Sequence, residues 1–491
     1  MCAAGCSLLE VAVLPAPRGL IHDIAEQAFS RAAGAPLISG NAVRVLLDGE
    51  ENYSAWLEAI RHAGQSVLFE NYIIEEDEVG WAFAEALSER ARAGVKVRVI
   101  RDWLGSLGGA SNQFWRGLEA AGVEVRCFNP PQLTSPLGWL SRDHRKMIAI
   151  DGRIGFVTGL CVSKRWLGDP ARPLSAWRDT GLEVRGPAIV YLERAFAQVW
   201  RETGAALPPE LLSEPGSIPL AGQVSLRIVA DEPNSTGLFR LDQIIAAAAR
   251  RTLWLTDAYF VGFAPYVQAL RAAARDGVDV RLLVPSTTDL PLISPLSRAG
   301  YRPLLEAGVR VFEWNGTMIH AKTAVADGRW ARIGSSNLNL ASFVGNYELD
   351  AAIDDEQVAR KMEEIYEADL SNSTEITLTA RKRVKPLRPR RVRAPLGARP
   401  PVGAVRFANA VGAAAAASTR TLGAVESSIM LGLALMLLAI AAIAIAWPTG
   451  MAYSIAAIGV WFALTLLLRI YRTARQRQHE AAGGARSAPP E

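Results

Sequence analysis

The sequence predicts an α/β protein in which two duplicated domains pack about a pseudo-twofold axis and a transmembrane helical hairpin follows at the C-terminal end. Three observations carry this prediction. Short β-rich runs alternate with longer helical patterns from residue 43 onward, which is typical of α/β units on a sheet. Three segments of that pattern recur in the same order 176 to 186 residues later, and residues 429–468 contain no charged side chain.

The first domain begins with an alternation of strands and helices. Helices are expected at 52–63 and 79–93, where apolar residues have helical spacing and the runs end near Gly64 and Gly94. Runs rich in β-branched and other apolar residues are expected to form strands at 43–47, 66–74 and 95–101.

The duplication divides the chain into two domains. Segments 92–100, 118–126 and 144–152 recur as 275–283, 304–312 and 320–328. A period of this length indicates two domains rather than a solenoid of short repeats. Between them, residues 206–223 are rich in proline and glycine, which interrupt regular structure. The predicted organisation is an N-terminal segment at 1–40, a first domain at 41–210 and a second domain at 220–380.

The C-terminal residues 381–491 are strongly basic, whereas the rest of the chain is acidic. They carry 16 Lys and Arg against 3 Asp and Glu, which leaves a net charge of −9 for residues 1–380. Such a tail indicates an anionic partner, either a membrane surface or a nucleic acid. Residues 381–425 are expected to form a basic linker without a core, which is either a solvated spacer or a segment that binds anionic lipid head groups.

Residues 429–468 are expected to form two transmembrane helices. A Pro-Thr-Gly turn at 448–450 divides them into two runs, and each run, at about 1.5 Å per residue, is long enough to cross a hydrocarbon core of roughly 30 Å. Basic residues lie on both outer flanks, including the basic tail at 469–491, and none lies in the turn. The positive-inside rule therefore places both flanks and the two domains on the cytoplasmic side. The alternative, a buried hairpin of a soluble protein, needs a further domain large enough to cover it.

The four cysteines indicate neither a disulfide framework nor a zinc site. Cys2, Cys6, Cys127 and Cys161 lack the paired Cys and His spacings that such sites use. Residues 1–10 contain no basic stretch followed by an apolar run, so a cleaved secretory signal is not expected. We therefore expect reduced thiols, no metal site and a body in the cytosol.

A His-x-Lys-x4-Asp motif occurs at the same point of both repeats. The chain has only five histidines, and two of them open the motif. The six motif residues are the candidate catalytic residues His144, Lys146, Asp151, His320, Lys322 and Asp327. Two matches at equivalent points of a duplication indicate one composite site with a histidine from each half.

These residue types suit the cleavage of a phosphodiester. The anionic phosphate needs positive charge that strengthens as the transition state forms, and Lys146 and Lys322 supply it. One imidazole is able to attack phosphorus and form a covalent phosphohistidine, which divides a difficult displacement into two easier ones. The other protonates the leaving alkoxide and then deprotonates the incoming alcohol, for which a pKa near neutrality is suited. In each motif, His and Lys are two residues apart on a strand and are expected to project from the same face.

The segments that follow the motifs provide candidate substrate-binding residues. The second half offers Ser335 and Asn337, whose small or amide side chains let donors approach phosphate oxygens, and Glu348, a carboxylate able to orient a histidine. Asp179 is the expected counterpart of Glu348 in the first half, where Cys161 stands at the place of Asn337. The alternative for these flanking residues is ordinary turn chemistry.

The sequence resembles the phospholipase D superfamily, and in particular bacterial cardiolipin synthases, over residues 43–379. The resemblance rests on the two motifs, on the segments 334–337, 177–180 and 186–188, and on their order. It implies two phospholipase D-type domains and a ping-pong phosphatidyl transfer without metal or other cofactor. It further implies that His144 is the nucleophile, that His320 is the general acid and base, and that the motif Asp residues support the fold of the active centre.

The resemblance also implies partners and a location. The substrates are expected to be phospholipids, with phosphatidylglycerol as donor and acceptor and phosphatidylethanolamine as a second candidate donor, and no nucleic acid is expected. The protein is expected in the bacterial inner membrane as a multi-pass protein with cytoplasmic catalytic domains. The oligomeric state is left open.

Two departures from the family pattern stand out. Thr158 and Cys161 replace the usual residues after the first motif, and the hairpin is C-terminal, whereas familiar members carry N-terminal helices. Two other functions remain open at this point: hydrolysis by a phospholipase or nuclease that uses the same histidines, and a catalytically silent membrane scaffold.

Overall fold

The computed structural model describes residues 20–131, 141–169, 175–290 and 293–378, together with 384–386, 453, 460 and 461. Almost all of the expected basic linker, hairpin and tail therefore lies outside the described residues. Within the described part of the chain, no helix has both the length and the apolar character needed to cross a bilayer.

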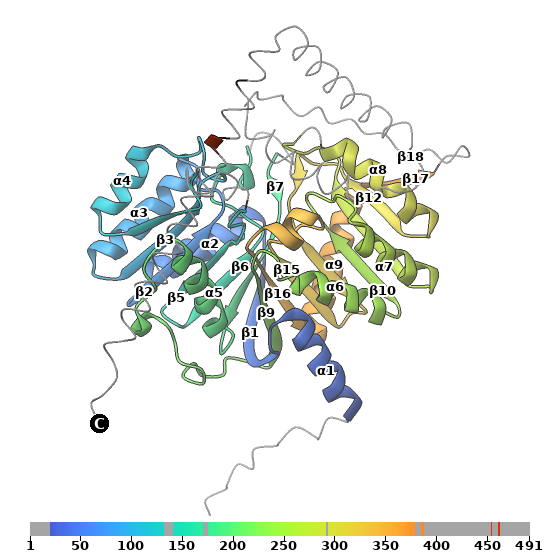
Figure 1. Cartoon of the computed structure of the whole chain (residues 1–491), viewed down its shortest axis with the longest axis horizontal. Helices are drawn as coiled ribbons and strands as arrows, with labels where there is room; N and C mark the ends of the chain where they lie inside the picture. The colour runs from blue at the N-terminus through green and yellow to red at the C-terminus, as the bar shows by residue number, and fades with distance from the viewer. Residues whose placement is uncertain are drawn as a thin grey trace, which may run out of the picture.

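The chain forms two successive α/β halves, preceded by helix α1 (Leu20–Ala33), so the predicted duplication of an α/β unit is confirmed (Figure 1). The first half contains β1 (Ile38–Leu47), α2 (Asp48–Arg61), β2 (Ser66–Asn71), α3 (Glu78–Arg92), β3 (Lys96–Asp102), α4 (Asn112–Ala120), β4 (Glu124–Phe128), β5 (Met147–Ile150), β6 (Ile154–Thr158), β7 (Trp177–Arg178), β8 (Thr180–Arg185) and α5 (Ile189–Glu202). The second half contains β9 (Val224–Asp231), α6 (Gly237–Ala248), β10 (Thr252–Thr256), α7 (Ala264–Arg275), β11 (Asp279–Pro285), α8 (Ile293–Glu306), β12 (Arg310–Trp314), β13 (Met318–Ile319), β14 (Thr323–Ala326), β15 (Trp330–Gly334), β16 (Glu348–Asp354), α9 (Glu356–Ser371), β17 (Ser373–Leu378) and β18 (Val384–Pro386).

The expected helices and strands of the first half agree with these bounds to within a few residues. The largest difference is in β1, which begins five residues earlier than expected. Helix α2 begins four residues earlier than the apolar spacing indicated, because Asp48, Glu50 and Glu51 make up its acidic first turn. Helix α3 begins where Asp77 caps it, since the Asp77 carboxylate accepts hydrogen bonds from the backbone N–H groups of Val79 and Gly80.

The two halves have the same strand order, read from each outer edge of the sheet toward its centre. The first half reads β4-β3-β2-β5-β6-β8-β1, and the second half, beyond the edge strands β18 and β17, reads β12-β11-β10-β14-β15-β16-β9. Strands β1 and β9 pair antiparallel at the centre. Equivalent strands that pair antiparallel are the arrangement expected for a pseudo-twofold axis between the halves.

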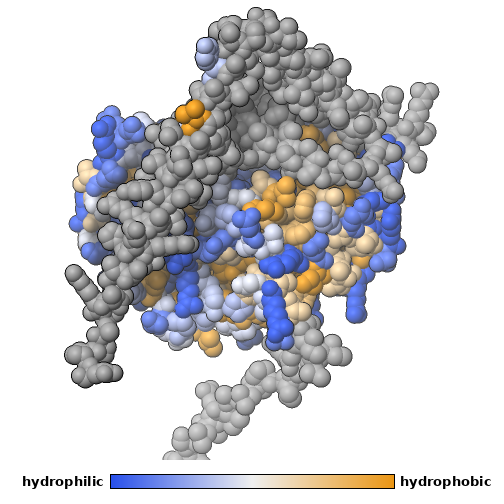
Figure 2. Space-filling model, in the orientation of Figure 1, coloured by the Kyte–Doolittle hydropathy of each residue, from blue (hydrophilic) through white to orange (hydrophobic). Residues whose placement is uncertain are grey.

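Three hydrophobic cores hold the layers together. Helices α5 and α9 share one core with strands of both halves, in which Trp200 and Met362 are buried. Helices α2 to α4 cover the first half with a second core, and α6 to α8 cover the second half with a third. On the face drawn in Figure 2, hydrophobic residues gather over the second half, where α6 and α7 are rich in alanine, and hydrophilic residues lie around them.

This topology decides where the motif residues lie. Strand β5 runs antiparallel to β2, and β14 runs antiparallel to β10, so the beginning of β5 or β14 lies beside the end of its partner. The sequence analysis expected each histidine within a strand. In the structure, His144 and His320 come just before β5 and β14. The four strand residues that follow each motif lysine then carry the chain to the opposite edge of the sheet.

Candidate active site

Backbone contacts between the halves hold the two histidines in place. The His144 N–H donates to the carbonyl oxygen of Tyr347 at 2.9 Å, and the His320 N–H donates to that of Arg178 at 2.7 Å. Tyr347 and Arg178 directly precede the carboxylate residues Glu348 and Asp179. Each histidine is therefore fixed against the segment that carries the acidic residue of the other half.

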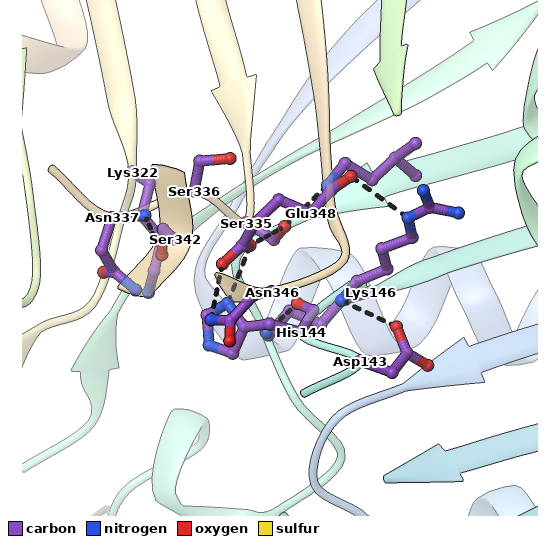
Figure 3. A network of polar contacts seen from close by, with 12 residues as sticks. Asp143, His144, Lys146, Lys322, Ser335, Ser336, Asn337, Ser342, Asn346 and Glu348 are labelled. Atoms are coloured by element: carbon purple, nitrogen blue, oxygen red, sulfur yellow. Dashed lines mark hydrogen bonds and ion pairs between the residues drawn. The ribbon is translucent and has the colours of Figure 1, made fainter. Parts of the chain in front are cut away.

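The side chains cross between the halves in the same way. Nδ1 of His144 lies 2.9 Å from Oε2 of Glu348, and Nδ1 of His320 lies 2.8 Å from Oδ2 of Asp179. Figure 3 shows the first of these pairs, with the His144 ring directed at the carboxylate. All four side chains are buried, so each half supplies a histidine and the carboxylate that orients the other histidine.

Two side chains donate hydrogen bonds to the Glu348 carboxylate, and a backbone N–H group holds one of these side chains in place. The Ser335 hydroxyl donates to Oε2 at 2.6 Å, the Asn346 amide donates to Oε1 at 3.1 Å, and the backbone N–H of Leu349 donates to the Ser335 hydroxyl at 2.9 Å. The Ser335 hydroxyl is therefore engaged as a donor to Glu348 and as an acceptor from Leu349, and its expected contact with substrate stays a prediction.

Trp166 supports Asp179 in the first half, and sequence reasoning missed it. The Trp166 indole N–H donates to Oδ2 of Asp179 at 2.9 Å, and the Thr180 backbone N–H donates to Oδ1 at 2.9 Å. The Trp166 ring also meets the His320 ring edge-on, at 5.3 Å between centroids. An isolated tryptophan between the motif and Asp179 gives no signal of such a role, because most buried tryptophans only fill a core.

The two motif lysines lie beside the histidines but contact them differently. Lys146 Nζ donates to the carbonyl oxygen of His144 and lies 5.0 Å above the Tyr72 ring. Lys322 Nζ lies 2.9 Å from each ring nitrogen of His320 and also donates to its carbonyl oxygen. Among the described residues, Nε2 of His144 has no hydrogen-bond partner. The two halves are thus not equal, since only the His144 ring presents an unengaged nitrogen.

A tyrosine ring makes an edge-to-face contact with each histidine ring. Tyr72 meets the His144 ring at 4.8 Å between centroids, and Tyr259 meets the His320 ring at 5.8 Å. Both tyrosines lie just after an equivalent strand, β2 or β10. An alignment of the repeats from the starts of these strands places the two tyrosines one position apart, so the sequence did not reveal this pair.

Burial favours the neutral form of both imidazoles. Desolvation lowers the pKa of His144 to about 4 and that of His320 to about 3, although Glu348 and Asp179 act in the opposite direction. Burial alone raises the pKa of each of these carboxylates, but the hydrogen bond from the partner histidine and the charge of the nearby motif lysine hold it below its usual value. A neutral imidazole whose Nδ1–H donates to a carboxylate keeps its lone pair on Nε2, which is the form that a nucleophile needs.

The motif lysines are fully buried cations. Desolvation lowers the pKa of Lys322 to about 8, with Asp179 raising it and Lys146 lowering it further. Desolvation also lowers the pKa of Lys146. With a pKa of about 8, Lys322 retains most of its charge at neutral pH, and Lys146 places a second amine beside it for an anionic phosphate.

The structure does not bring Asp151 and Asp327 to the histidines. The Asp151 carboxylate accepts backbone hydrogen bonds from Gly64, Gln65 and Ser66 at 2.7 to 2.8 Å, where β2 begins. The Asp327 carboxylate accepts the equivalent bonds from Arg250, Arg251 and Thr252 at 2.7 to 2.9 Å, where β10 begins. Each aspartate lies at the far end of β5 or β14 from its histidine, because this four-residue strand separates it from its motif lysine.

Asn337 and Cys161 occupy equivalent places in the two halves, three residues after β15 and β6. Asn337 is buried, and its side-chain oxygen has no hydrogen-bond partner among the described residues. Figure 3 shows it beside Lys322 and Ser342. Cys161 is also buried, and its carbonyl oxygen accepts a hydrogen bond from the Tyr53 hydroxyl at 2.5 Å. The Cys161 thiol, in place of the Asn337 amide, is a second difference between the halves.

Comparison with known proteins agrees with this geometry. A family model described as "Cardiolipin synthase, PLD-like domain" matches residues 56–200 and 241–370. The chain is 33% identical over 350 residues to a cardiolipin synthase of Alkalihalophilus pseudofirmus, covering 70% of this chain and 69% of that one. It is 34% identical over 365 residues to cardiolipin synthase A of Pseudomonas aeruginosa, covering 74% and 73%.

A solved structure shares the fold at low sequence identity. The crystal structure of phosphatidylserine synthase from Haemophilus influenzae superimposes with a TM-score of 0.57 at 14% identity, covering 72% of this chain and 92% of that one. Within the described residues, no group of three or more His, Cys, Asp and Glu side chains is arranged to hold a metal ion. The chain belongs to the cardiolipin synthase family of proteins with phospholipase D-like domains.

Proposed function

We propose that the crossed pairs of histidine and carboxylate transfer a phosphatidyl group from one phosphatidylglycerol molecule to another and so make cardiolipin. The chain is a phosphatidyltransferase of the phospholipase D superfamily. The observation that carries the proposed mechanism is the meeting of two neutral histidines, each oriented by the other half, with two buried lysines in one cluster.

His144 is the nucleophile of the first step. Its free Nε2 attacks phosphorus, a nitrogen–phosphorus bond forms, and the bond from phosphorus to the glycerol head group breaks. His320 gives a proton to the departing glycerol oxygen, which leaves as free glycerol. The phosphate of the bound lipid supplies negative charge that raises the pKa of His320, so that it carries this proton when the lipid is in place.

The second step returns the enzyme to its starting state. The free hydroxyl on the head group of a second phosphatidylglycerol attacks the phosphorus, and His320 takes the hydroxyl proton. The nitrogen–phosphorus bond breaks, and its electron pair returns to Nε2 of His144. No proton or electron is consumed over the two steps. Lys146 and Lys322 stabilise the charge that develops on the phosphate oxygens in both.

Two features of the site support this assignment of roles. Lys322 lies against the ring nitrogens of His320, whereas Nε2 of His144 is unengaged. A histidine next to an ammonium is placed to exchange protons, and a histidine with a free lone pair is placed to attack. Glu348 is held by Ser335 and Asn346, which fixes the ring that must approach phosphorus.

The substrate also determines where the protein works. Phospholipids are confined to membranes, and the uncharged residues 429–468 with their basic flanks provide an anchor of two transmembrane helices. In the proposed topology this anchor holds both halves at the cytoplasmic face of the bacterial inner membrane. The basic linker then lies near anionic head groups.

The same intermediate permits hydrolysis if water replaces the second lipid, so one assay decides between the two reactions. The purified full chain is incubated with phosphatidylglycerol vesicles and no added metal. We expect free glycerol and cardiolipin in equal amounts. Phosphatidic acid as the only lipid product would refute the synthase assignment. Vesicles that also contain phosphatidylethanolamine test the second donor, and the His144→Ala and His320→Ala variants should each abolish turnover.

A further inference from the structure

A cavity of about 250 Å³ lies outside the active site, on the first half. One wall is the exposed face of helix α5, and the other is the segment that joins the two halves. The lining residues are Arg194, Ala197, Gln198 and Arg201 on α5 and Ala206, Leu207 and Leu212 on the joining segment. Figure 1 shows α5 beside β5 and β6, where its far side is free of other helices.

Two arginines on this wall have no anionic partner. Arg194, Gln198 and Arg201 are four and three residues apart, so they lie on one face of the helix. Neither guanidinium has a hydrogen-bond acceptor or ion pair among the described residues; Arg194 only lies above the Tyr191 ring, at 5.7 Å. Two unpaired guanidinium groups beside one hollow attract an anion.

The equivalent helix of the second half lacks this feature. On α9, the exposed cations are paired along the helix: Arg360 with Glu356 at 3.0 Å and Lys361 with Glu364 at 3.2 Å. On α5, by contrast, no carboxylate lies three or four residues from Arg194 or Arg201.

The opposite wall limits the chemistry of the ligand. Leu207 is buried and Leu212 is partly buried, so the joining segment offers an apolar surface across from the arginines. A carboxylate satisfies one guanidinium, whereas a phosphate has three acceptor oxygens and bridges two. The best match is a phosphate ester whose carbon portion packs against the leucines.

The cavity connects to the active site through two hydrogen bonds. The side-chain oxygen of Gln198 accepts from Arg145 at 2.8 Å, and Arg145 Nε donates to the Glu348 carbonyl oxygen at 3.1 Å. Arg145 is fully buried next to His144. The cavity is therefore separate from the active site, and Gln198 and Arg145 connect it to Glu348, which orients His144.

We propose that this cavity is a second binding site, for a phosphate ester held by Arg194 and Arg201. The same chemistry is found in a soluble ester such as glycerol phosphate and in the head group of an anionic phospholipid. The proposal does not depend on the reaction that the active site performs, because the cavity contains none of the motif residues.

Binding to the full chain tests the proposal in two arms. In the soluble arm, calorimetry measures the affinity for glycerol 3-phosphate. In the lipid arm, calorimetry compares a water-soluble short-chain phosphatidic acid with the matching phosphatidylcholine, because the proposed anchor would carry the full chain onto any vesicle. The test variant is Arg194→Ala/Arg201→Ala. The control is Arg92→Ala/Arg275→Ala, which removes the same charge from exposed positions on α3 and α7.

We expect the test variant to bind at least about tenfold more weakly than wild type in one arm, because it loses two charge-assisted contacts. The control should stay within about twofold in that arm. The arm that responds identifies the source of the phosphate. Hydrogen exchange should show protection of residues 206–212 by that ligand in wild type and not in the test variant. Equal affinities of test and control variants, or no binding by wild type in either arm, would overturn the proposal.

Discussion

The carboxylate of Glu348 in the second half lies 2.9 Å from Nδ1 of His144 in the first half. The reciprocal pair, His320 with Asp179, crosses in the opposite direction at 2.8 Å. Because each histidine depends on a carboxylate from the other half, neither half alone contains an oriented histidine. The site exists only when the halves pack as they do.

Exchanging either carboxylate for an amide tests this dependence. Glu348→Gln keeps the size of the side chain but loses the charge that fixes the Nδ1–H tautomer of His144, and Asp179→Asn does the same for His320. We expect kcat to fall about 100-fold in each variant, measured as glycerol release from phosphatidylglycerol vesicles. Unfolding midpoints measured beside wild type separate this effect from loss of fold. Wild-type turnover in either variant would contradict the crossed pairing.

Asp151 and Asp327 should behave in the opposite way. Each carboxylate accepts three backbone N–H groups at the start of β2 or β10, far from the histidines. We expect Asp151→Asn and Asp327→Asn to lower the free energy of unfolding by about 1 to 3 kcal/mol. Denaturant titration measures this loss.

Their kcat values should remain within about threefold of wild type in the folded protein. A hundredfold loss of kcat without a loss of stability would instead place these carboxylates in the chemistry.

At saturating lipid, where His320 carries its proton, the pH dependence of kcat should be bell-shaped, with widely separated limbs set by His144 and Lys322. His144 must be neutral to attack, and its pKa is lowered to about 4 mainly by burial, so activity falls as the pH drops toward 4. Lys322 must be charged, and burial lowers its pKa to about 8, so activity falls as the pH rises above 8. An acid limb near 6.5, the ordinary value for histidine, would show that His144 is not desolvated as the structure indicates.

Trp166 should act as a positioning residue for Asp179. Trp166→Phe keeps an aromatic ring beside His320 but removes the N–H that donates to the carboxylate at 2.9 Å. We expect kcat to fall about tenfold and KM to change little. Trp177→Phe is the matched control, since the Trp177 ring also packs on His320 but its N–H has no acceptor among the described residues. Equal effects of both changes would assign Trp166 to packing alone.

The sequence predicted the duplicated α/β fold and the motif residues, because both depend on local patterns that recur. The motif spacing also indicates where the aspartate lies. The four residues between Lys and Asp form the whole of β5 or β14, so the aspartate lies at the other end of the strand from the lysine. The exchange of carboxylates was not predictable from either repeat, since it depends on how the halves pack across β1 and β9. Trp166 was missed for the same reason, as its partner Asp179 serves a histidine of the other half.

The division of labour between His144 and His320 is the central claim, and covalent labelling tests it most directly. The full chain is mixed with phosphatidylglycerol radiolabelled at phosphorus, quenched in alkali within a single turnover and digested, and the labelled peptide is identified. We expect the label on the peptide that contains His144, in the wild type and, accumulating at low turnover, in Asp179→Asn. Label on the peptide that contains His320, or no covalent label at all, would contradict the account.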